Sequence, residues 1–279
     1  MTPYETSGEA TATWTRPTFP GQSGKTVATF MSSNTRPAAG TGVWMSKARI
    51  AVLYENSDYG RDLLKGLERG LGTKRSRIVA KATYEVTDSD VNSQIARLRR
   101  SKADTFMLFA LPLQAIQSFV YADKLKWRPQ IFVSAVSIEP RVMGIARAAT
   151  NGRATNNALS VAFVKDPTSP AWRRDKAVAL YHKIMKRYFP GGKANDVYNW
   201  YGMTVAFSMV DALKHAGRTP TRESLRRAMT HMNESTNPFL LPGVTIRTSP
   251  SNYFPMTKSR MVGYRKNLWV LFGPLVNAR

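Results

Sequence analysis

The sequence predicts an α/β protein in which helices flank a parallel β-sheet. From Arg49 onward, short apolar runs rich in β-branched residues alternate with segments whose apolar residues recur at helical spacing. Such alternation is typical of βαβ units, and runs without a polar face are typical of strands buried on both sides. With 279 residues, 43% of them hydrophobic, the chain can bury a sizeable core.

The first βαβ unit is predicted from Arg49–Tyr54 (RIAVLY) as a strand, Arg61–Leu71 as a helix and Arg77–Tyr84 as a strand. Gly72 stands where a helix C-cap glycine belongs. The helix has one apolar face, formed by Leu63, Leu64, Leu67 and Leu71.

The pattern continues through the middle of the chain. A helix is expected from about Val91 to Ser101, with Ile95 and Leu98 directed inward. The following elements are predicted as a strand at Thr105–Phe109, a helix at Leu113–Leu125 and a strand at Gln130–Ser134.

Longer helices dominate the next part of the chain. After a strand at Ala158–Val164, helices are expected at about Pro170–Tyr188 and Val197–Ala216, and Thr221 is an N-cap candidate with Glu223 in its first turn. The apolar positions of the second long helix are Met203, Ala206, Phe207, Val210 and Leu213. The tail predicts strands at Gly243–Thr248, Arg260–Tyr264 and Leu268–Phe272, the last two joined by a turn at Arg265–Asn267.

Residues 1–48 differ from the rest, because they are rich in Thr, Ser, Gly and Pro and show no regular period. We expect this segment to be mostly irregular. Pro20–Thr26 (PGQSGKT) resembles a phosphate-binding loop, but Phe19 stands where that motif requires glycine, so a flexible loop is the expectation.

Composition excludes several classes of site. The chain has no cysteine, which removes disulfides, thiol nucleophiles and cysteine-based zinc sites. No stretch approaches the roughly 20 apolar residues that cross a bilayer. The N-terminal sequence MTPYETSGEATATWTRP has no basic region followed by an apolar one, so no signal peptide is expected in this chain.

No residue pattern indicates catalysis. His182, His215 and His231 fall on separate predicted helices, without metal-ligand spacing. Asp88 and Asp90 precede a helix, where N-capping explains them better than paired acid–base work. The sequence therefore predicts a protein that is not an enzyme and needs no metal and no cofactor.

The net charge of +23 comes from 41 Lys and Arg against 18 Asp and Glu, and it will attract polyanions. The basic clusters lie on helices whose other face is apolar, so solvated helix faces are expected, scattered rather than gathered in one stripe. No specific nucleic-acid partner is predicted. The clusters are Arg97, Arg99, Arg100 and Lys102; Arg173, Arg174 and Lys176; Lys183, Lys186 and Arg187; and Arg222, Arg226 and Arg227.

In an open parallel sheet, ligands bind beyond the carboxyl ends of the strands. This rule places Tyr54–Tyr59, Ala110–Leu113 and Ser134–Ser137 around one cleft. A second aromatic group, Tyr198, Trp200 and Tyr201, opens the long helix, and packing is its expected role, with lining of a hinge as the alternative.

Several segments in the right order resemble the branched-chain amino-acid group of ABC-transporter substrate-binding proteins, which are type I periplasmic binding proteins related to leucine/isoleucine/valine-binding protein. The resemblance runs from Ala48 to the end, about four-fifths of the chain. The matching segments are RIAVLYENSDYGRDLLKGLERGLG, YEVTDSDVNSQIARLRRSKADTF, VKDPTSPAW, VYNWYGMTVAFSMVDAL and LLPGVTIRTSPSNYFPM with the closing hairpin.

The resemblance implies a type I periplasmic-binding-protein-like fold with one complete lobe and a partial second lobe. Residues 49–164 with 249–279 would form the complete ligand-binding lobe. Residues 165–248 would form part of the other lobe with the crossing segments, and residues 1–48 would be a remnant of that lobe.

The resemblance also implies ligand contacts from three loops of the complete lobe. In amino-acid binders the third loop supplies a carboxylate for the ligand's ammonium group. Here Val136 stands closest to that position and the next acid is Glu139, which favours an apolar or aromatic carboxylate over an α-amino acid. The expected contact residues are Tyr54, Asp58, Tyr59, Ala110, Leu111, Pro112, Ser134, Ala135 and Val136.

The function implied is that of the solute-binding component of an ABC transporter in the periplasm. It would capture a small organic solute, either an amino acid or an apolar or aromatic carboxylate, between two lobes and deliver it to a membrane permease. Two alternatives stay open: a ligand-sensing regulatory domain on the same fold, and a truncated relic without function. In the relic, exposed apolar faces on the long helices would favour aggregation or a homodimer.

Overall fold

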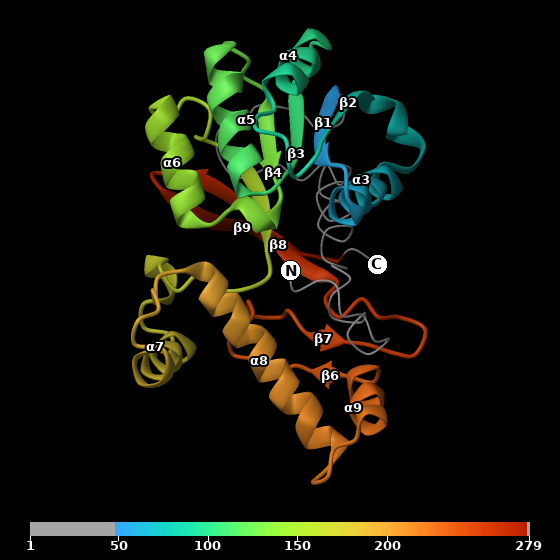
Figure 1. The fold of residues 1–279 in the computed structure, drawn as a ribbon, viewed down its shortest axis with the longest axis vertical. Coiled ribbons are helices and arrows are strands. Elements are labelled where there is room, and N and C mark those ends of the chain that lie inside the picture. Colours follow the sequence, from blue (N-terminus) through green and yellow to red (C-terminus); the bar gives the residue numbers. More distant parts are fainter. Residues whose placement is uncertain (1–47, 278–279) are drawn as a thin grey trace. The chain divides into compact units, whose positions relative to one another are not determined.

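A seven-stranded sheet with the order β2-β1-β3-β4-β5-β8-β9 organises the larger part of the chain (Figure 1). The computed structural model describes residues 48–277, so the predictions for residues 1–47, including the phosphate-loop resemblance, lie outside the described residues. The described residues divide into two units. We call residues 48–162 with 259–277 the sheet unit and Phe163–Lys258 the helical unit.

The sheet unit is built from βαβ repeats, as the sequence predicts. β1 pairs in parallel with β2 on one side and with β3 on the other, and β3 pairs in parallel with β4. β5 continues the parallel order, whereas β8 runs antiparallel to β5 and leads into β9. The strands are β1 Ile50–Glu55, β2 Ile78–Tyr84, β3 Thr105–Phe109, β4 Gln130–Val133, β5 Leu159–Ala162, β8 Lys258–Arg265 and β9 Leu268–Asn277.

Alternate residues of each strand feed two separate hydrophobic cores. Ala51 and Leu53 of β1 pack with the core that contains α4, α5 and α6, while Ile50 and Val52 pack with the core that contains α3. Helices therefore cover both faces of the sheet, which explains why these strands are apolar along their whole length. The helices are α3 Asp58–Leu71, α4 Asn92–Arg100, α5 Pro112–Lys124 and α6 Pro140–Thr150.

Several predicted details are confirmed. Ile95 and Leu98 of α4 are fully buried, and Gly72, with φ of 54°, follows α3 as its C-cap. The turn between β8 and β9 places Lys266 and Asn267 at positive φ, as a two-residue hairpin turn requires. Thr221 caps α9 (Arg222–Met229) through a reciprocal hydrogen-bond pair with Ser224.

Other details are corrected. α6 is not among the helices predicted above, although Pro140 at its first position and Glu139 as its N-cap are start signals. The helix expected at Pro170–Tyr188 is a short 3-10 turn, Pro170–Trp172, followed by α7 at Lys176–Tyr188, because the carboxylate of Asp175 caps a new helix start. Of the strand expected at Gly243–Thr248 only β7, Ile246–Arg247, forms, paired with β6 at Asn233–Glu234.

The helical unit packs α7 against the start of α8 (Val197–Ala216). Trp200 is fully buried there, stacked edge-on against Phe239 and Tyr181 at ring-centroid distances of 5.1 Å each. Its indole N–H donates to the carbonyl oxygen of Phe239 at 3.1 Å. Packing is therefore the role of Trp200, whereas Tyr198 is 46% exposed.

The buried face of α8 is partly polar. Its buried residues are Trp200, Thr204, Ser208 and Ala212, whereas Val210 and Leu213 are 50% and 38% exposed. The apolar positions named from the sequence therefore divide, since Met203 and Phe207 pack partly buried against the core while Val210 and Leu213 lie at the surface.

Candidate ligand-binding site

Three loops meet at one edge of the sheet unit. They follow β1, β3 and β4, three neighbouring strands that run parallel and therefore end at the same edge. Each loop leads into a secondary-structure element: α3 after β1, α5 after β3 and the short 3-10 turn Ala135–Ser137 after β4. We call this the carboxyl edge.

A chain of hydrogen bonds joins the three loops. The Tyr59 hydroxyl, in the first turn of α3, donates to Ser134 Oγ at 2.8 Å. The Ser134 hydroxyl lies 3.4 Å from the carbonyl oxygen of Ala110, which also accepts from Ser137 Oγ at 2.7 Å. Tyr59 and Ser134, which are 75 positions apart in the sequence, are therefore held together at this edge.

A second hydrogen-bonded chain lies at the same edge and fixes the loop after β3. The Leu111 N–H donates to the Tyr84 hydroxyl oxygen at 2.9 Å, and that hydroxyl donates to Glu55 Oε2 at 3.2 Å. Tyr84 and Glu55 are 1% and 5% exposed. Burial raises the pKa of Tyr84 far above its ordinary value, so its hydroxyl keeps the proton that it donates to Glu55.

Gly60 allows the loop after β1 to close tightly. A Cβ at this position would lie 2.1 Å from the carbonyl oxygen of Glu55 and 2.7 Å from its nitrogen. The start of α3 thus packs directly on the backbone at the end of β1, and this close approach brings Tyr59 toward Ser134.

The predicted contact residues fall into two groups. Tyr59, Ala110, Leu111 and Ser134 belong to the hydrogen-bonded chains just described. The others lie in or next to the same three loops: Tyr54 and Ala135 are half-buried, Pro112 is the first residue of α5, and Val136 is 37% exposed.

Asp58 lies apart from the chains. Its side chain is 96% exposed and lies 3.7 Å from a guanidinium nitrogen of Arg61. Ser57, and not Asp58, is the N-cap residue of α3. Asp58 is instead the acidic residue of the first helical turn, where its charge is favourable.

Sequence reasoning missed Glu55 and Tyr84. The signal for Glu55 was an acid directly after a buried strand, and the signal for Tyr84 was a polar aromatic residue at the end of the neighbouring strand. Neither signal is specific, because the meeting of the two depends on β1 and β2 being adjacent in the sheet.

Glu139 is the acid nearest in sequence to the loop after β4. It is 5% exposed, and its Oε2 accepts from the N–H groups of Arg141 and Val142 at 2.9 and 3.1 Å. Its Oε1 is buried without a hydrogen-bond partner. The start of α6 therefore stabilises one oxygen of this carboxylate and leaves the other unused.

The acids considered as paired carboxylates have separate structural roles. Asp90 Oδ1 accepts from the Asn92 N–H at 2.8 Å, at the start of α4, and Asp88 Oδ2 accepts from the Glu85 N–H at 2.9 Å within a turn. The N-cap residue of α4 is Val91, so helix capping in the strict sense is wrong for both. Between residues 48 and 277 no group of three His, Cys, Asp or Glu side chains is arranged to hold a metal ion.

The fold and the edge together define a class of protein. A sheet with the parallel order β2-β1-β3-β4-β5, helices on both faces and linked loops at the carboxyl ends is the type I periplasmic binding fold. The sequence matches the family model described as "Periplasmic binding protein" over residues 2–264, and the chain belongs to this family.

Solved structures agree on the fold. The branched chain amino acid ABC transporter from Thermus thermophilus with bound valine has a TM-score of 0.73 and 14% identity, covering 92% of this chain and 65% of its own. The solute binding protein from R. palustris in complex with benzoate has a TM-score of 0.65 and 15% identity, covering 92% and 64%. The leucine binding protein from Thermotoga maritima has a TM-score of 0.67 and 14% identity, covering 92% and 66%.

The present chain thus spans just under two thirds of the length of these three structures. A search of the curated proteins finds no match. Within the described part of the chain, no helix is long and apolar enough to cross a membrane.

Proposed function

We propose that this chain is the solute-binding component of an ABC transporter and acts by binding, without a chemical step. The observation that carries the proposal is the hydrogen-bonded chain from Tyr59 through Ser134 to Ala110, which joins three loops where the fold places ligands. The proposal extends to a membrane permease as the partner and to the periplasm as the compartment, in line with the family.

Ligand capture in such a protein is a shift between conformations driven by binding energy. The pre-formed part of the site would be the carboxyl edge, because its loops are fixed to one another before a ligand arrives. Such pre-organisation lowers the entropy cost of binding, since few backbone dihedrals remain to be ordered.

We further propose an apolar or aromatic carboxylate as the ligand. The position expected to supply the counter-charge in the loop after β4 is Val136, which has no charge and is 37% exposed. The carboxylate of Asp58 is 96% exposed, so neither residue offers a buried negative charge to an ammonium group. Leaving an ammonium without a counter-charge costs several kcal/mol. The aromatic rings of Tyr54 and Tyr59 favour apolar or aromatic ligands instead.

One observation favours an α-amino acid as a second candidate. Glu139 Oε1 is buried without a partner, and a carboxylate oxygen of this kind would bind an ammonium group if the ligand reached it. Only the α-amino acid carries an ammonium group that could pair with the Glu139 carboxylate, so a substitution of Glu139 should affect the two kinds of ligand differently.

A thermal-shift and calorimetric screen of the full chain against benzoate, related aromatic carboxylates, valine and leucine tests the proposal. A ligand should raise the melting temperature in proportion to the logarithm of its concentration. The absence of a shift with every compound of both classes, in a folded protein, would contradict the proposed function.

Two variants then separate the candidates. Glu139→Gln keeps the helix-capping oxygen but removes the charge, so it should leave carboxylate binding within about twofold and abolish most amino-acid binding. Tyr59→Phe removes the hydroxyl that donates to Ser134 and should weaken any ligand by about threefold to tenfold. Tyr188→Phe, at a tyrosine that is 71% exposed, is the matched control and should change nothing.

A further inference from the structure

The edge of the sheet unit opposite the carboxyl edge is strongly basic. It consists of the segments that precede β2, β3, β4 and β5 together with the turn between β8 and β9, and we call it the basic edge. Its residues are 72–77, 99–104, 124–130, 147–157 and 265–267. Asp104 is the one acid in these segments, and every segment carries at least two Lys or Arg residues.

The first two segments contribute exposed cations side by side. Lys74 and Arg75 follow α3, and Arg99, Arg100 and Lys102 end α4, all of them exposed. The starts of β2 and β3 both pair with the start of β1, so these two segments flank the same strand.

The single negative charge of Asp104 offsets only part of this positive charge, and local groups bind its carboxylate. Its Oδ1 accepts from the Arg49 N–H at 3.0 Å and from the Thr105 hydroxyl at 2.8 Å. The Arg49 guanidinium donates to the Ser101 carbonyl oxygen at 2.9 Å, which adds one more cation to the edge.

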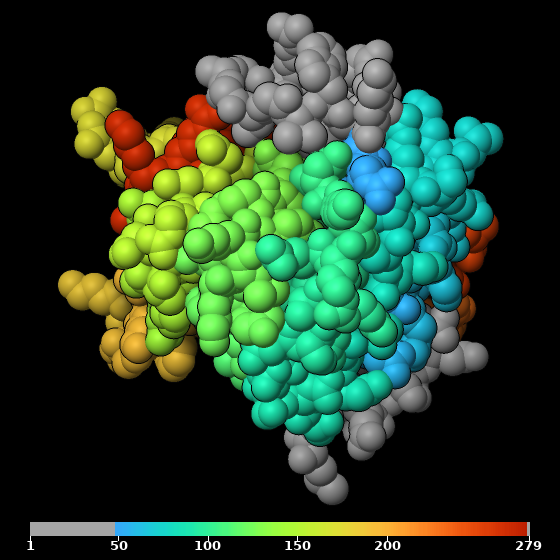
Figure 2. All heavy atoms as spheres, turned by 90° about the horizontal axis from the view of Figure 1, so that it is seen from above, coloured from blue at the N-terminus to red at the C-terminus, as the bar shows by residue number. Residues whose placement is uncertain are grey.

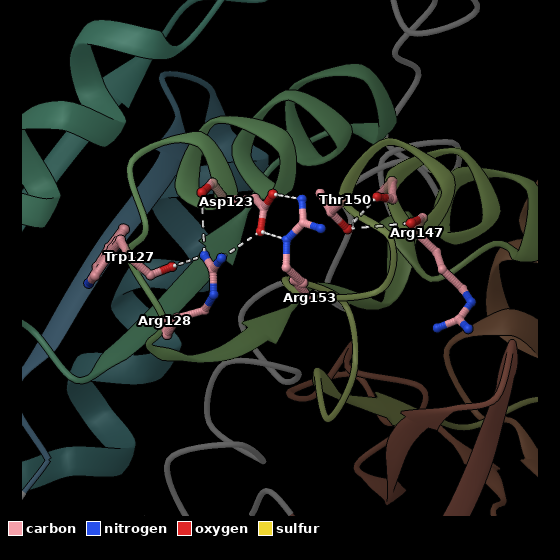
Figure 3. Close-up of polar contacts among 7 residues, drawn as sticks. Asp123, Trp127, Arg128, Arg147, Thr150 and Arg153 are labelled. Atoms are coloured by element: carbon pink, nitrogen blue, oxygen red, sulfur yellow. Dashed lines mark hydrogen bonds and ion pairs between the residues drawn. The ribbon is translucent and has the colours of Figure 1, made fainter.

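The segments before β4 and β5 each bring one arginine to the carboxylate of Asp123 in α5 (Figure 3). Asp123 Oδ1 lies 2.7 Å from Arg128, and Asp123 Oδ2 lies 2.7 Å from Arg153. The hydrogen bond from Arg153 lowers the pKa of Asp123, with a further contribution from Arg128. One negative charge meets two positive ones, so this cluster retains a net positive charge, and Lys126 beside it is exposed.

Hydrogen bonds join the other three segments to the segment 99–104. The Gln130 N–H donates to the Asp104 carbonyl oxygen at 2.7 Å, and the Gln130 side-chain amide donates to the Asn157 carbonyl oxygen at 2.8 Å. The Asn157 N–H in turn donates to the Tyr264 carbonyl oxygen at 3.0 Å, which places the exposed turn residues Arg265 and Lys266 at the same edge. Figure 2 looks onto this end of the sheet unit, where segments coloured from cyan through green to lime adjoin.

Of the four basic clusters named from the sequence, only the one with Arg99, Arg100 and Lys102 belongs to this edge, and its other cations were not singled out from the sequence. Parallel βαβ topology returns every helix C-terminus to one edge of the sheet, so charges far apart in the sequence gather there. Favourable interaction with helix dipoles explains a cation in the last turn of each helix. It does not explain the cations of the loops and of the β8–β9 turn, which lie beyond the last turns.

The character of the surface favours a phosphate-rich plane over nucleic-acid bases. The aromatic residue of these segments, Trp127, is 8% exposed, and its indole N–H is bonded to the Ala103 carbonyl oxygen at 3.0 Å, so it is not free to stack on a base. The segments are short loops and helix ends, without a helix or strand that protrudes to enter a groove.

We propose that the basic edge docks on the anionic phospholipid headgroups of a membrane. The choice of a membrane over another polyanion rests on the proposed function, because a transporter component works beside a bilayer. Each Lys or Arg near an anionic bilayer strengthens binding by about fivefold at low salt. The carboxyl edge, at the other end of the strands, stays clear of such a surface.

Co-sedimentation of the full chain with vesicles tests this inference. The vesicles are pure phosphatidylcholine or phosphatidylcholine with a quarter of phosphatidylglycerol, over a salt series. One variant removes four charges of the basic edge, and a matched variant with the same net charge removes four exposed charges of the helical unit. The edge variant is Lys74→Gln, Arg99→Gln, Arg100→Gln and Lys102→Gln, and the control is Arg173→Gln, Arg174→Gln, Lys183→Gln and Lys186→Gln.

We expect salt-sensitive binding to the anionic vesicles alone, reduced at least about tenfold in the edge variant and less than about threefold in the control. Equal losses in the two variants would overturn the inference in favour of adhesion by total charge. Tighter retention on duplex DNA than on the anionic vesicles at the same salt would overturn it in favour of a nucleic acid. The vesicles carry neither permease nor solute, so this result is separate from that of the thermal-shift screen, and unchanged melting temperatures confirm that the variants fold.

Discussion

The two units of this protein differ in how closely the apolar face of a helix matches the face that is buried. In α3 of the sheet unit, the leucines that the pattern directs inward are buried, with Leu63 1% and Leu67 0% exposed. In α8 of the helical unit, apolar Val210 and Leu213 lie at the surface while Thr204 and Ser208 are buried at 2% and 0% exposure. α3 buries its apolar stripe, whereas α8 packs Met203 and Phe207 partly buried against the core and leaves Val210 and Leu213 exposed.

The difference arises from what each helix finds to pack against. α3 packs on a sheet whose strands present apolar residues such as Val52 and Met107. The buried face of α8 is occupied by the chain segment around Asn237, whose side-chain amide donates to the Thr204 carbonyl oxygen at 3.0 Å and to Ser208 Oγ at 3.1 Å. A polar partner selects the polar face, so an amphipathic pattern predicts burial only where an apolar partner surface is present.

Removal of the main core residue of the helical unit should have the largest effect. Trp200→Ala should lower the free energy of unfolding by about 3–5 kcal/mol, because it leaves a cavity between Phe239 and Tyr181. Urea denaturation followed by circular dichroism measures this loss. Tyr198→Ala, on the exposed side of the same helix, is the control, and a similar loss there would contradict the assignment of Trp200 as the core.

The sheet unit should be most sensitive to added volume at its carboxyl edge. Gly60→Ala places a methyl group against the Glu55 backbone and should destabilise by about 3 kcal/mol, at the upper end of overpacking costs. Gly144→Ala, at a helical glycine with open space around its Cβ position, should instead stabilise by about 0.5–1 kcal/mol.

Thermal and urea unfolding of these two variants distinguish a steric effect from a general effect of glycine replacement. If Gly60→Ala proved neutral, the close packing of α3 on the end of β1, and with it the pre-formed loop, would be wrong.

The reversed face of α8 gives a third prediction. Asn237→Ala should cost about 2 kcal/mol, because it removes the buried acceptor of the Phe239 N–H and the amide that donates to Ser208 Oγ. Val210→Ser should change stability by less than about 0.5 kcal/mol, since Val210 is 50% exposed. The opposite order of effects would show that the apolar face of α8 is the buried one after all.

The smallest effects are expected from pH, with opposite signs in the two units. Burial raises the pKa of Glu234 in the helical unit above its ordinary 4.5. The contribution of Glu234 to the free energy of unfolding is therefore fully present below pH 4.5 and is lost as the pH rises through the raised pKa. Hydrogen bonding to Arg153 lowers the pKa of Asp123 in the sheet unit. The contribution of Asp123 to the free energy of unfolding is therefore fully present above pH 3.8 and is lost as the pH falls through the lowered pKa.

Denaturation measured across this pH range should therefore respond to Glu234→Gln on the alkaline side and to Asp123→Asn on the acid side. Each variant should flatten its own limb of the stability profile and leave the other limb unchanged. A change of both limbs by either variant would contradict the assignment of these shifts to separate units.

Much of the sheet unit could be predicted, because its signals are local. The strand Thr105–Phe109 is observed with the predicted bounds, and the helix Val197–Ala216 of the other unit is as well, since apolar period and cap residues lie within each segment. The loops that carry Tyr59, Ala110 and Ser134 were also placed at one edge, because the rule for parallel strands needs only their order in the chain.

The parts that could not be predicted depend on which elements become neighbours. The bond of Tyr84 to Glu55 requires β2 beside β1, and the pairing of Arg153 with Asp123 joins segments 30 residues apart. The basic edge was missed for the same reason, since in the sequence its charges belong to five separate segments.

The sequence by itself determined where strands and helices begin and end over most of residues 48–277 and which loops follow parallel strands. These properties depend on backbone geometry and on neighbours within a few positions. Only the tertiary structure decided that Tyr59 meets Ser134, that α8 buries its Thr204 face, and that cations gather at one edge. The reason is that such contacts depend on the order of strands in the sheet and on the partner that each face finds, and neither is encoded within a single segment.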